Sequence, residues 1–172
     1  MAKINTQPEN TSFLQPTKFQ LTFTRMPHLT YFCQTFNLPG VSMSEIVRNT
    51  PFVDLNVPGD KIQYDPLDFT FIVDENLRTW LEVHNWIVGL TFPKNFGQYR
   101  KLKEEYKDYG GTVSEAVVTI LSNKNTPNIR VTFRDCFPIN VSSIQFDYTM
   151  DANMILTATT TFKYNYFDID IL

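Results

Sequence analysis

The chain has little of the chemistry that most enzymes and metalloproteins use. It holds two cysteines and two histidines among 172 residues. Cys33 and Cys136 lie far apart in apolar segments, so we expect buried free thiols and neither a metal knuckle nor a redox pair. His28 and His84 stand outside any spaced metal motif, and a structural imidazole is more common than a general base.

The sequence also lacks a phosphate loop, a dinucleotide glycine fingerprint and a nucleophile elbow. Carboxylates do gather in two places, where a pair of them could face each other or hold a cation. Aspartates are equally expected in turns and at strand ends, and we favour that interpretation for Asp54, Asp60, Asp65 and Asp68 and for Asp168 and Asp170. We therefore expect no catalytic residues, no cofactor and no metal, and an enzyme is a distant hypothesis.

Positive charge and long apolar runs are missing as well. The formal charge is −3, whereas proteins that grip phosphate backbones usually carry a positive excess. No apolar run approaches the roughly 20 residues that span a bilayer. The polar start, Met1 to Asn10, has no apolar core typical of a secretory signal. We expect a protein made in a cytoplasm and without membrane anchoring.

Aromatic residues are abundant at 15%, and Phe and Tyr favour strands. The clearest pattern is Leu156 to Tyr166, where apolar and polar residues alternate with the period of a long β-strand. We expect the run of Ile144, Phe146 and Tyr148 to pair with one edge of this strand. The other edge is expected to pair with a further subunit.

Other alternating segments predict more strands. Phe19 to Thr24 and Tyr31 to Phe36, separated by a turn at Pro27, predict an opening hairpin. Further strands are predicted at Leu67 to Val73, Ser114 to Leu121 and Ile129 to Arg134. At this length we expect a single mainly β domain over residues 19–172, preceded by a polar arm over residues 1–18.

The segment from Met43 to Asp60 is an extended excursion bounded by prolines. It carries too many apolar residues for a solvated loop. Either another subunit or the core of the domain itself should cover them.

One amphipathic helix is predicted over Leu77 to Val88, opened by Asp74 and stopped by Gly89. Its expected apolar face consists of Leu77, Trp80, Leu81, His84, Ile87 and Val88, with Trp80 and Trp86 as anchors. The following Phe92 to Gly111 insertion predicts a short charged helix with Tyr99, Leu102 and Tyr106 on one side. Its mixture of basic and aromatic residues is also compatible with a single-stranded nucleic-acid-binding β domain, using Lys94 to Lys107.

The order of these segments resembles the tail tube protein family of contractile-tailed bacteriophages. The resemblance covers the chain from about Phe19 onward. It depends on the Cys33 to Gly40 segment with its Leu-Pro-Gly ending, the excursion ending in Val57-Pro58-Gly59-Asp60, the Asp74 to Trp86 stretch, and the final Phe137 to Tyr166 segment. Tubes of type VI secretion systems are similar in design.

The resemblance implies an antiparallel β-sandwich or partial barrel with one flanking helix. Six copies would form a homohexameric ring with a ring-wide β-barrel, and rings would stack into the inner tail tube of the virion. The implied partners are further copies of the chain, the tail sheath protein, the tape-measure protein and the baseplate initiator. DNA would pass through the tube without specific binding during genome ejection, after assembly in the host cytoplasm.

On this hypothesis we expect contacts between subunits or rings on the excursion and on the last long strand. The strands Phe19 to Thr24, Phe137 to Tyr148 and Leu156 to Tyr166 would supply inter-subunit sheet. The expected contact residues are Met43, Glu45, Val47, Arg48, Phe52, Leu55, Val57, Asp60, Thr157, Thr159 and Lys163. A baseplate tube initiator or hub ring protein of the same fold is the alternative, because the 92–111 insertion departs from the simplest members of the family.

Overall fold

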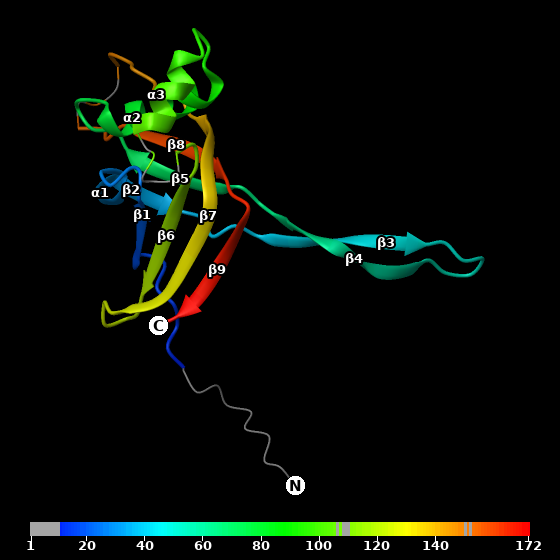
Figure 1. Cartoon of the computed structure of the whole chain (residues 1–172). Coiled ribbons are helices and arrows are strands. Elements are labelled where there is room, and N and C mark those ends of the chain that lie inside the picture. Colours follow the sequence, from blue (N-terminus) through cyan, green and yellow to red (C-terminus); the bar gives the residue numbers. More distant parts are fainter. Residues whose placement is uncertain (1–10, 106, 108–110, 150, 152) are drawn as a thin grey trace.

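A computed structural model describes residues 11–105, 107, 111–149, 151 and 153–172 (Figure 1). Within these residues the chain forms nine strands and three helices. In chain order they are β1 (Phe19–Phe23), α1 (Leu29–Phe32), β2 (Cys33–Phe36), β3 (Val41–Arg48), β4 (Leu55–Tyr64), β5 (Leu67–Ile72), α2 (Arg78–Thr91), α3 (Gly97–Glu105), β6 (Ser114–Leu121), β7 (Pro127–Val141), β8 (Thr157–Lys163) and β9 (Tyr166–Ile171).

Two antiparallel sheets share the long strand β7. Its first half pairs with β6 on one edge and with β9 on the other, and β1 extends this sheet beyond β6. Its second half pairs with β8, which is followed by β5 and β2. The sheets lie over each other as a sandwich closed on one side by β7 (Figure 1). The predicted mainly β, antiparallel fold is confirmed.

The change of sheet happens between Arg134 and Phe137 of β7. Asp135 adopts a left-handed backbone with φ of 56°, a conformation that Asp tolerates better than most residues. Its carboxylate accepts a hydrogen bond from the side-chain amide of Asn165 at 2.8 Å. Asn165 lies between β8 and β9, so the long strand predicted for Leu156 to Tyr166 is wrong in this respect. It breaks after Lys163, because β8 and β9 belong to different sheets.

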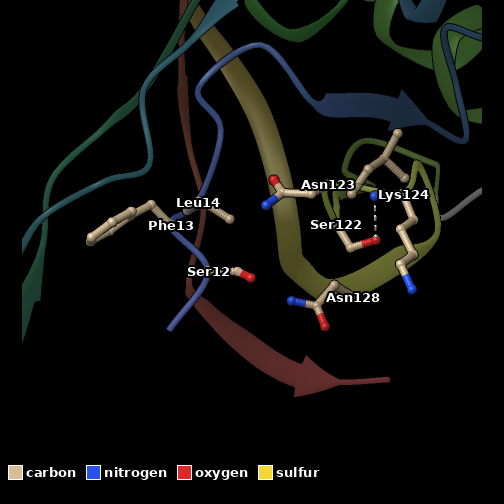
Figure 2. A pocket seen from close by; sticks show the side chains of 8 residues that line it. Ser12, Phe13, Leu14, Ser122, Asn123, Lys124 and Asn128 are labelled. Carbon is tan, nitrogen blue, oxygen red and sulfur yellow. Dashed lines mark hydrogen bonds between the residues drawn. The ribbon is translucent and has the colours of Figure 1, made fainter. Parts of the chain in front are cut away.

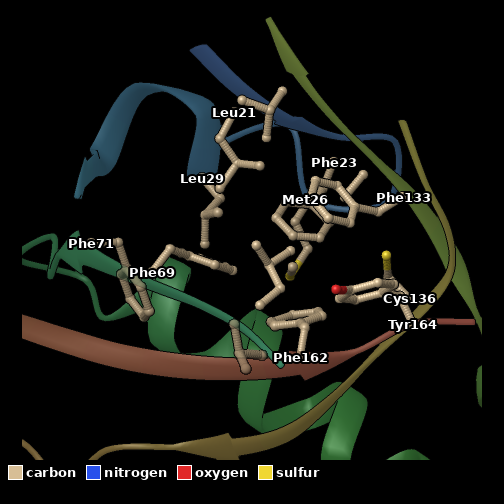
Figure 3. Packing of buried hydrophobic residues seen from close by; sticks show 14 of the residues in the cluster. Leu21, Phe23, Met26, Leu29, Phe69, Phe71, Phe133, Cys136, Phe162 and Tyr164 are labelled. Atoms are coloured by element: carbon tan, nitrogen blue, oxygen red, sulfur yellow. The ribbon is translucent and has the colours of Figure 1, made fainter. Parts of the chain in front are cut away.

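The core fills the space between the two sheets and is dominated by phenylalanine (Figure 3). Phe23, Phe69 and Phe162 are fully buried, and their ring centroids lie 5.0 to 5.5 Å apart. Alternate residues of β5 and β8 point into this core, as the period-two pattern predicts. Such tilted ring pairs add to the free energy gained from burying apolar area.

Helix α2 packs beside β7 and closes one end of the core. Trp86 is buried, contacts Phe162 edge-on at 5.7 Å, and donates a hydrogen bond from Nε1 to the carbonyl of Thr112 at 2.9 Å. Trp80 is half-buried and donates to the carbonyl of Ser142 at 3.1 Å. Both tryptophans thus anchor the helix. Asp74 accepts hydrogen bonds from the backbone and hydroxyl of Thr79 in the first turn.

Two predictions about this helix are wrong. The buried face consists of Thr79, Val83, Trp86 and Gly89, so the predicted face is displaced around the helix and Leu81 is exposed. Gly89 does not end the helix, which continues to Thr91. A Cβ atom at Gly89 would lie 2.8 Å from Leu102 Cδ1, so this glycine serves the close approach of α3.

The prediction of an opening hairpin is also wrong, because its two strands do not pair with each other. β1 pairs with β6, and β2 pairs with β5 in the other sheet. Met26 and Leu29 are buried between them, so the chain crosses the core at α1 instead of turning back. The predicted second strand begins only at Cys33, because Tyr31 lies in α1.

The run of Ile144, Phe146 and Tyr148 is not a strand. The partner of β8 is the end of β7, with Phe137 opposite Lys163 and Val141 opposite Thr160. The strand predicted at Ile129 to Arg134 is therefore longer than expected and takes the place assigned to the later segment. The short helix predicted in the insertion is confirmed as α3, with Leu102 buried; Tyr106 lies outside the described residues.

Candidate assembly surfaces

The predicted excursion is a two-stranded ribbon that projects far from the sandwich (Figure 1). We call β3, β4 and the turn between them the projecting hairpin. Val41 pairs with Tyr64 at its base and Arg48 pairs with Leu55 near its tip. A hydrogen bond from the backbone of Asp65 to the carbonyl of Gly40, at 3.1 Å, closes the base. The excursion is therefore longer than the predicted Met43 to Asp60.

The hairpin residues are exposed and lie outside the core of the chain. Met43 is 61% exposed and Phe52 at the tip is 99% exposed. Among the other predicted contact residues, Val57 is half-buried, and the exposed ones are Glu45, Val47, Arg48, Leu55 and Asp60. Of the two covers considered for these apolar side chains, the core of this domain is therefore excluded.

An irregularity in the ribbon explains the Pro-Gly pair that looked like a boundary. The register shifts between Met43 and Glu45, leaving residues of β4 unpaired opposite Ser44. A Cβ atom at Gly59 would lie 2.4 Å from the carbonyl oxygen of Ser44, so only glycine fits there. Pro58 is tolerated because a two-stranded ribbon has a free edge on each strand. The sequence Val57-Pro58-Gly59-Asp60 therefore marks a bulge inside a strand.

The tip of the hairpin is a defined turn. The backbone of Val53 donates to Thr50 Oγ1 at 3.2 Å, and the hydroxyl of Thr50 donates to the carbonyl of Val53. These bonds fix the backbone on both sides of Phe52, whose ring has no cover within the described chain. A fixed, exposed aromatic side chain is typical of an anchor at an interface.

The sandwich offers further free strand edges. In the described part of the chain, β1, β2 and β9 each have a partner on one edge only. By contrast, residues 160–162 of β8 pair with both β5 and β7. The expectation that another subunit pairs with the edge of this strand is therefore wrong. Thr157, Thr159 and Lys163 are exposed on its outward face, where Thr159 lies 3.2 Å from the hydroxyl of Thr70.

The N-terminal arm, which the sequence suggests as a further part of the subunit contacts, presents an apolar pair that sequence reasoning did not single out. Figure 2 shows Ser12, Phe13 and Leu14 beside the turn between β6 and β7, around a hollow of about 250 Å³. Phe13 and Leu14 are both exposed. The available signal was an apolar pair inside an otherwise polar arm. Residues 1–10 of that arm lie outside the described residues.

Both histidines contact side chains of α2. His28 Nε2 lies 4.0 Å from Glu82 Oε1, and His84 stacks on Trp80 with centroids 5.0 Å apart. Burial raises the pKa of Glu82. Glu82 borders a hollow of about 420 Å³ between α2 and α3, whose other charged lining residues are Arg25, Lys101 and Glu105. Among the described residues, no cysteine, serine or threonine lines this hollow.

The carboxylates and thiols stand in structural positions. Asp68 accepts a hydrogen bond from Thr161 at 2.6 Å, and Asp168 lies 3.9 Å from Arg134. Among the described residues, no group of three or more histidine, cysteine, aspartate or glutamate side chains is placed to hold a metal ion. Cys33 and Cys136 are free, and burial raises their pKa to about 11 and about 12.

Across the described ranges, no helix is both long and apolar enough to cross a membrane. The projecting hairpin, the open strand edges and the arm are the candidate assembly surfaces described so far.

Comparison with known proteins places these surfaces in context. A family model described as phage tail tube protein matches residues 3–170. The tail tube terminator protein of Enterobacteria phage T4 is 30% identical over 115 residues, which cover 66% of this chain and 60% of that protein. The chain thus spans about 60% of the length of this curated relative.

Solved structures with the same fold share little sequence. A chain of the anti-feeding prophage baseplate is 12% identical with a TM-score of 0.64, covering 93% of this chain and 96% of that one. A chain of the sheath-tube complex of an extracellular contractile injection system is 15% identical with a TM-score of 0.58, covering 94% of each. The tube-terminating cap of the anti-feeding prophage is 15% identical with a TM-score of 0.54 over the full length of both chains.

Proposed function

Because the chain belongs to the phage tail tube protein family, we propose that it is a structural virion protein whose copies close into hexameric rings and stack as the inner tube of a contractile tail. The observation that carries this proposal is the projecting hairpin, whose apolar side chains are uncovered in the single chain. The relatives are structural tail components, and we assign this chain no catalytic activity.

The hairpin needs a second surface for physical reasons. A two-stranded ribbon is at best marginally stable alone in water. This one leaves Met43, Ile46, Val47, Leu55 and Ile62 about half exposed or more, and Phe52 completely so. Burying such area yields roughly 25 cal/mol per Å². A neighbouring copy, in the same ring or the adjacent one, supplies the missing cover, and the predicted contact residues of the hairpin lie in that contact.

The open edges of β1, β2 and β9 complete the proposal. A free edge presents unpaired backbone groups, and closing edges between copies removes them. Copies arranged head to tail form a ring when their rotation closes. In the proposed ring, these edges join the sheets of neighbouring copies into one barrel wall.

The outward face of β8 and β5 suits a wall that lets a polyanion pass. It carries Thr70, Thr157 and Thr159, with Lys163 as the exposed cation of β8. With one exposed cation, and with the carboxylate of Asp68 on the same face, this surface gives little of the phosphate attraction that retains nucleic acid. We place the tape-measure protein and then DNA in the lumen. The sheath lies outside the tube, and a baseplate initiator lies at its start.

A second candidate is a terminator, a ring that ends the tube instead of extending it. It is favoured by the 30% identity with the T4 tail tube terminator. The baseplate initiator is a third role on the same fold. Stacking separates the three, because a tube subunit polymerises while a terminator or an initiator occupies one end only.

Negative-stain electron microscopy of the purified protein across a concentration series tests this proposal. Long hollow tubes are expected for a tube subunit, and single rings for a terminator or an initiator. Val47→Asp and Phe52→Asp should leave a folded monomer that no longer assembles. Asn56→Asp is the matched control, because it adds the same charge opposite Val47 without removing an apolar side chain.

The outcomes are separable. If Val47→Asp and Phe52→Asp assemble as the unchanged chain does, the hairpin is not the contact. If either variant fails to fold, its residue belongs to the core and the structural basis of the proposal is wrong. If the unchanged chain forms neither rings nor tubes on preformed tubes or baseplates, the proposed function is wrong.

A further inference from the structure

An exposed cluster of aromatic rings lies where α2 passes into α3. Phe92 contacts Phe96 and Tyr99, with ring centroids 5.1 and 6.1 Å apart. Phe96 is 78% exposed, and the other two rings are partly exposed. Helix α3 turns Leu102 inward against Gly89, and Tyr99 meets the Phe92 ring edge-on at an interplanar angle of 77°. Phe92 thus contacts both other rings, and we call this partly exposed aromatic cluster the platform.

This platform carries positive charge. Lys94, Arg100 and Lys103 alternate with its rings along the sequence, and the sequence from Phe92 to Lys103 contains no carboxylate, although Glu104 and Glu105 follow directly. Within the described chain, none of these three cations forms an ion pair. The whole chain has a formal charge of −3, so this basic aromatic surface contrasts with the rest of the molecule. Its chemistry fits a partner segment that combines carboxylates with aromatic side chains.

The loop after β7 has this complementary chemistry. It carries Phe146, Asp147, Tyr148 and Asp151, which we call the acidic aromatic loop. Phe146 is 74% exposed and Tyr148 is completely exposed. The backbone and hydroxyl of Thr149 each donate to Asp147 Oδ1 at 2.8 Å. These bonds lower the pKa of Asp147, so its carboxylate is ionised at neutral pH.

The loop reads as a strand in sequence but has no strand partner in the chain. Ile144, Phe146 and Tyr148 alternate with polar residues, yet this segment joins neither sheet. The described residues show no ion pair or ring contact between the loop and the basic aromatic surface of the same chain. Both features belong to the helical end of the molecule (Figure 1). Each is therefore available to another copy.

We infer that the acidic aromatic loop of one copy docks on the basic aromatic surface of the next copy around the ring. The contact is head to tail, because different surfaces of the two copies meet, and such contacts close into rings. Asp147 and Asp151 pair with Arg100 and Lys103, while Phe146 and Tyr148 pack on the platform of rings. The inference rests on the proposed function and names a ring contact separate from the projecting hairpin.

Charge exchange between the two surfaces tests this contact. Arg100→Glu with Lys103→Glu reverses the basic side, and Asp147→Lys with Asp151→Lys reverses the acidic side. Assembly of each double variant should require a protein concentration at least about tenfold higher, because like charges then face each other. The fourfold variant should recover assembly. Arg100→Lys with Lys103→Arg keeps both charges and is the matched control.

Sedimentation velocity and negative-stain microscopy at low and high salt provide the measurement. Recovery in the fourfold variant supports the contact, because two unrelated surfaces would show additive losses instead. The inference is overturned if the double variants assemble like the unchanged chain, or if the fourfold variant assembles no better than they do. Circular dichroism confirms that each variant is folded. Phe96→Ala removes one exposed ring without changing charge, and weaker assembly of this variant would support the contribution of the platform to the contact.

Two further results keep the inference apart from its alternatives. If the unchanged chain forms no ring under any condition, the proposed function fails, and this contact fails with it. If rings form and the charge-reversed variants assemble like the unchanged chain, only this contact is wrong. A labelled single-stranded oligonucleotide is the second probe. Salt-dependent binding that is lost in Arg100→Glu with Lys103→Glu, while assembly is unchanged, assigns the surface to nucleic acid and overturns the inference.

Discussion

The sandwich and the projecting hairpin contain the same kinds of apolar residue, but these are buried in the sandwich and exposed in the hairpin. Phe162 in β8 is 0% exposed, whereas Phe52 at the hairpin tip is 99% exposed. Phe162 contacts Phe23 of the opposite sheet and Trp86 of α2, while Phe52 has no such cover within the described chain. The difference shows that apolar content alone does not decide burial in this chain, because burial requires an opposing layer. Within the described chain no layer opposes Phe52, and under the proposed function a neighbouring copy supplies it.

The two regions also differ in pattern. In β5, buried and half-buried residues alternate strictly, which is the pattern of a strand with one face on a core. In β3 every residue is exposed, although apolar and polar residues are both present. A strand that carries apolar residues but is exposed on both faces, as β3 is, therefore indicates an interface better than a strand with one buried face. The following predictions test this contrast.

The largest effect is expected in the sandwich. Phe162→Ala removes a ring that contacts Phe23, Phe69 and Trp86. The free energy of unfolding should fall by about 3–5 kcal/mol, because a cavity remains in a closely packed core. Urea denaturation followed by tryptophan fluorescence measures this change. A loss below about 1 kcal/mol would contradict the described packing.

A smaller effect is expected where β7 changes sheets. Asp135→Val places a β-branched residue at φ of 56° and removes the hydrogen bond to Asn165. We expect a loss of about 1–2 kcal/mol in the free energy of unfolding. Asp135→Asn keeps a residue that tolerates this conformation and is the matched control. Equal stability of the Val and Asn variants would show that the backbone turn is not strained in this way.

Alkaline pH should weaken the sandwich and spare the hairpin contacts. Burial raises the pKa of Cys136 and of Tyr164 to about 12, above their usual values of 9.0 and 10.0. Their stabilising contribution is complete below about pH 9 and is lost as the pH rises towards 12, since the unfolded chain ionises first. Urea midpoints measured from pH 8 upward should therefore decrease. Cys136→Ala should make that decrease shallower, and an identical slope would assign it to other groups.

The smallest effect on folding is expected from removing the hairpin. Val41 pairs with Tyr64, so an Asn-Gly link can replace residues 42–63 without moving either strand end. Tyr64 is kept because its ring contacts Tyr164 and Phe167. The free energy of unfolding should change by less than about 1 kcal/mol, while assembly is lost. Sedimentation velocity and urea denaturation measure both, and an unfolded product would refute the separation of the two regions.

The sequence predicted the strands whose two faces differ. β5, β6 and β8 were found because their buried residues alternate with polar ones. α3 was found by its three-residue spacing and its charged exposed face. The hairpin was recognised as an excursion with too much apolar surface, although its strands were not, because both faces of β3 are exposed and no period appears.

Pairing over long distances was not predictable from local pattern. Nothing near Phe19 indicates that its partner is Ile120, so a local hairpin was the natural expectation. The sheet change at Asp135 and the close approach at Gly89 depend on neighbours from other elements. Ile144, Phe146 and Tyr148 have the period of a strand, but β7 already fills the place beside β8. In each of these cases, contacts with other elements of the fold outweighed the local preference of the sequence.

The position of β8 within its sheet also sets an order of events during synthesis. β8 lies between β5 and β7, so residues 67–72 and 137–141 cannot join into one sheet until residues 157–163 have been synthesised. Most contacts of the sandwich thus join distant parts of the chain, which slows folding. The hairpin, in contrast, is local and is made early. On the ribosome, the exposed apolar hairpin is therefore synthesised before residues 157–163 can complete the sandwich, and exposed apolar strands in such incomplete chains favour aggregation.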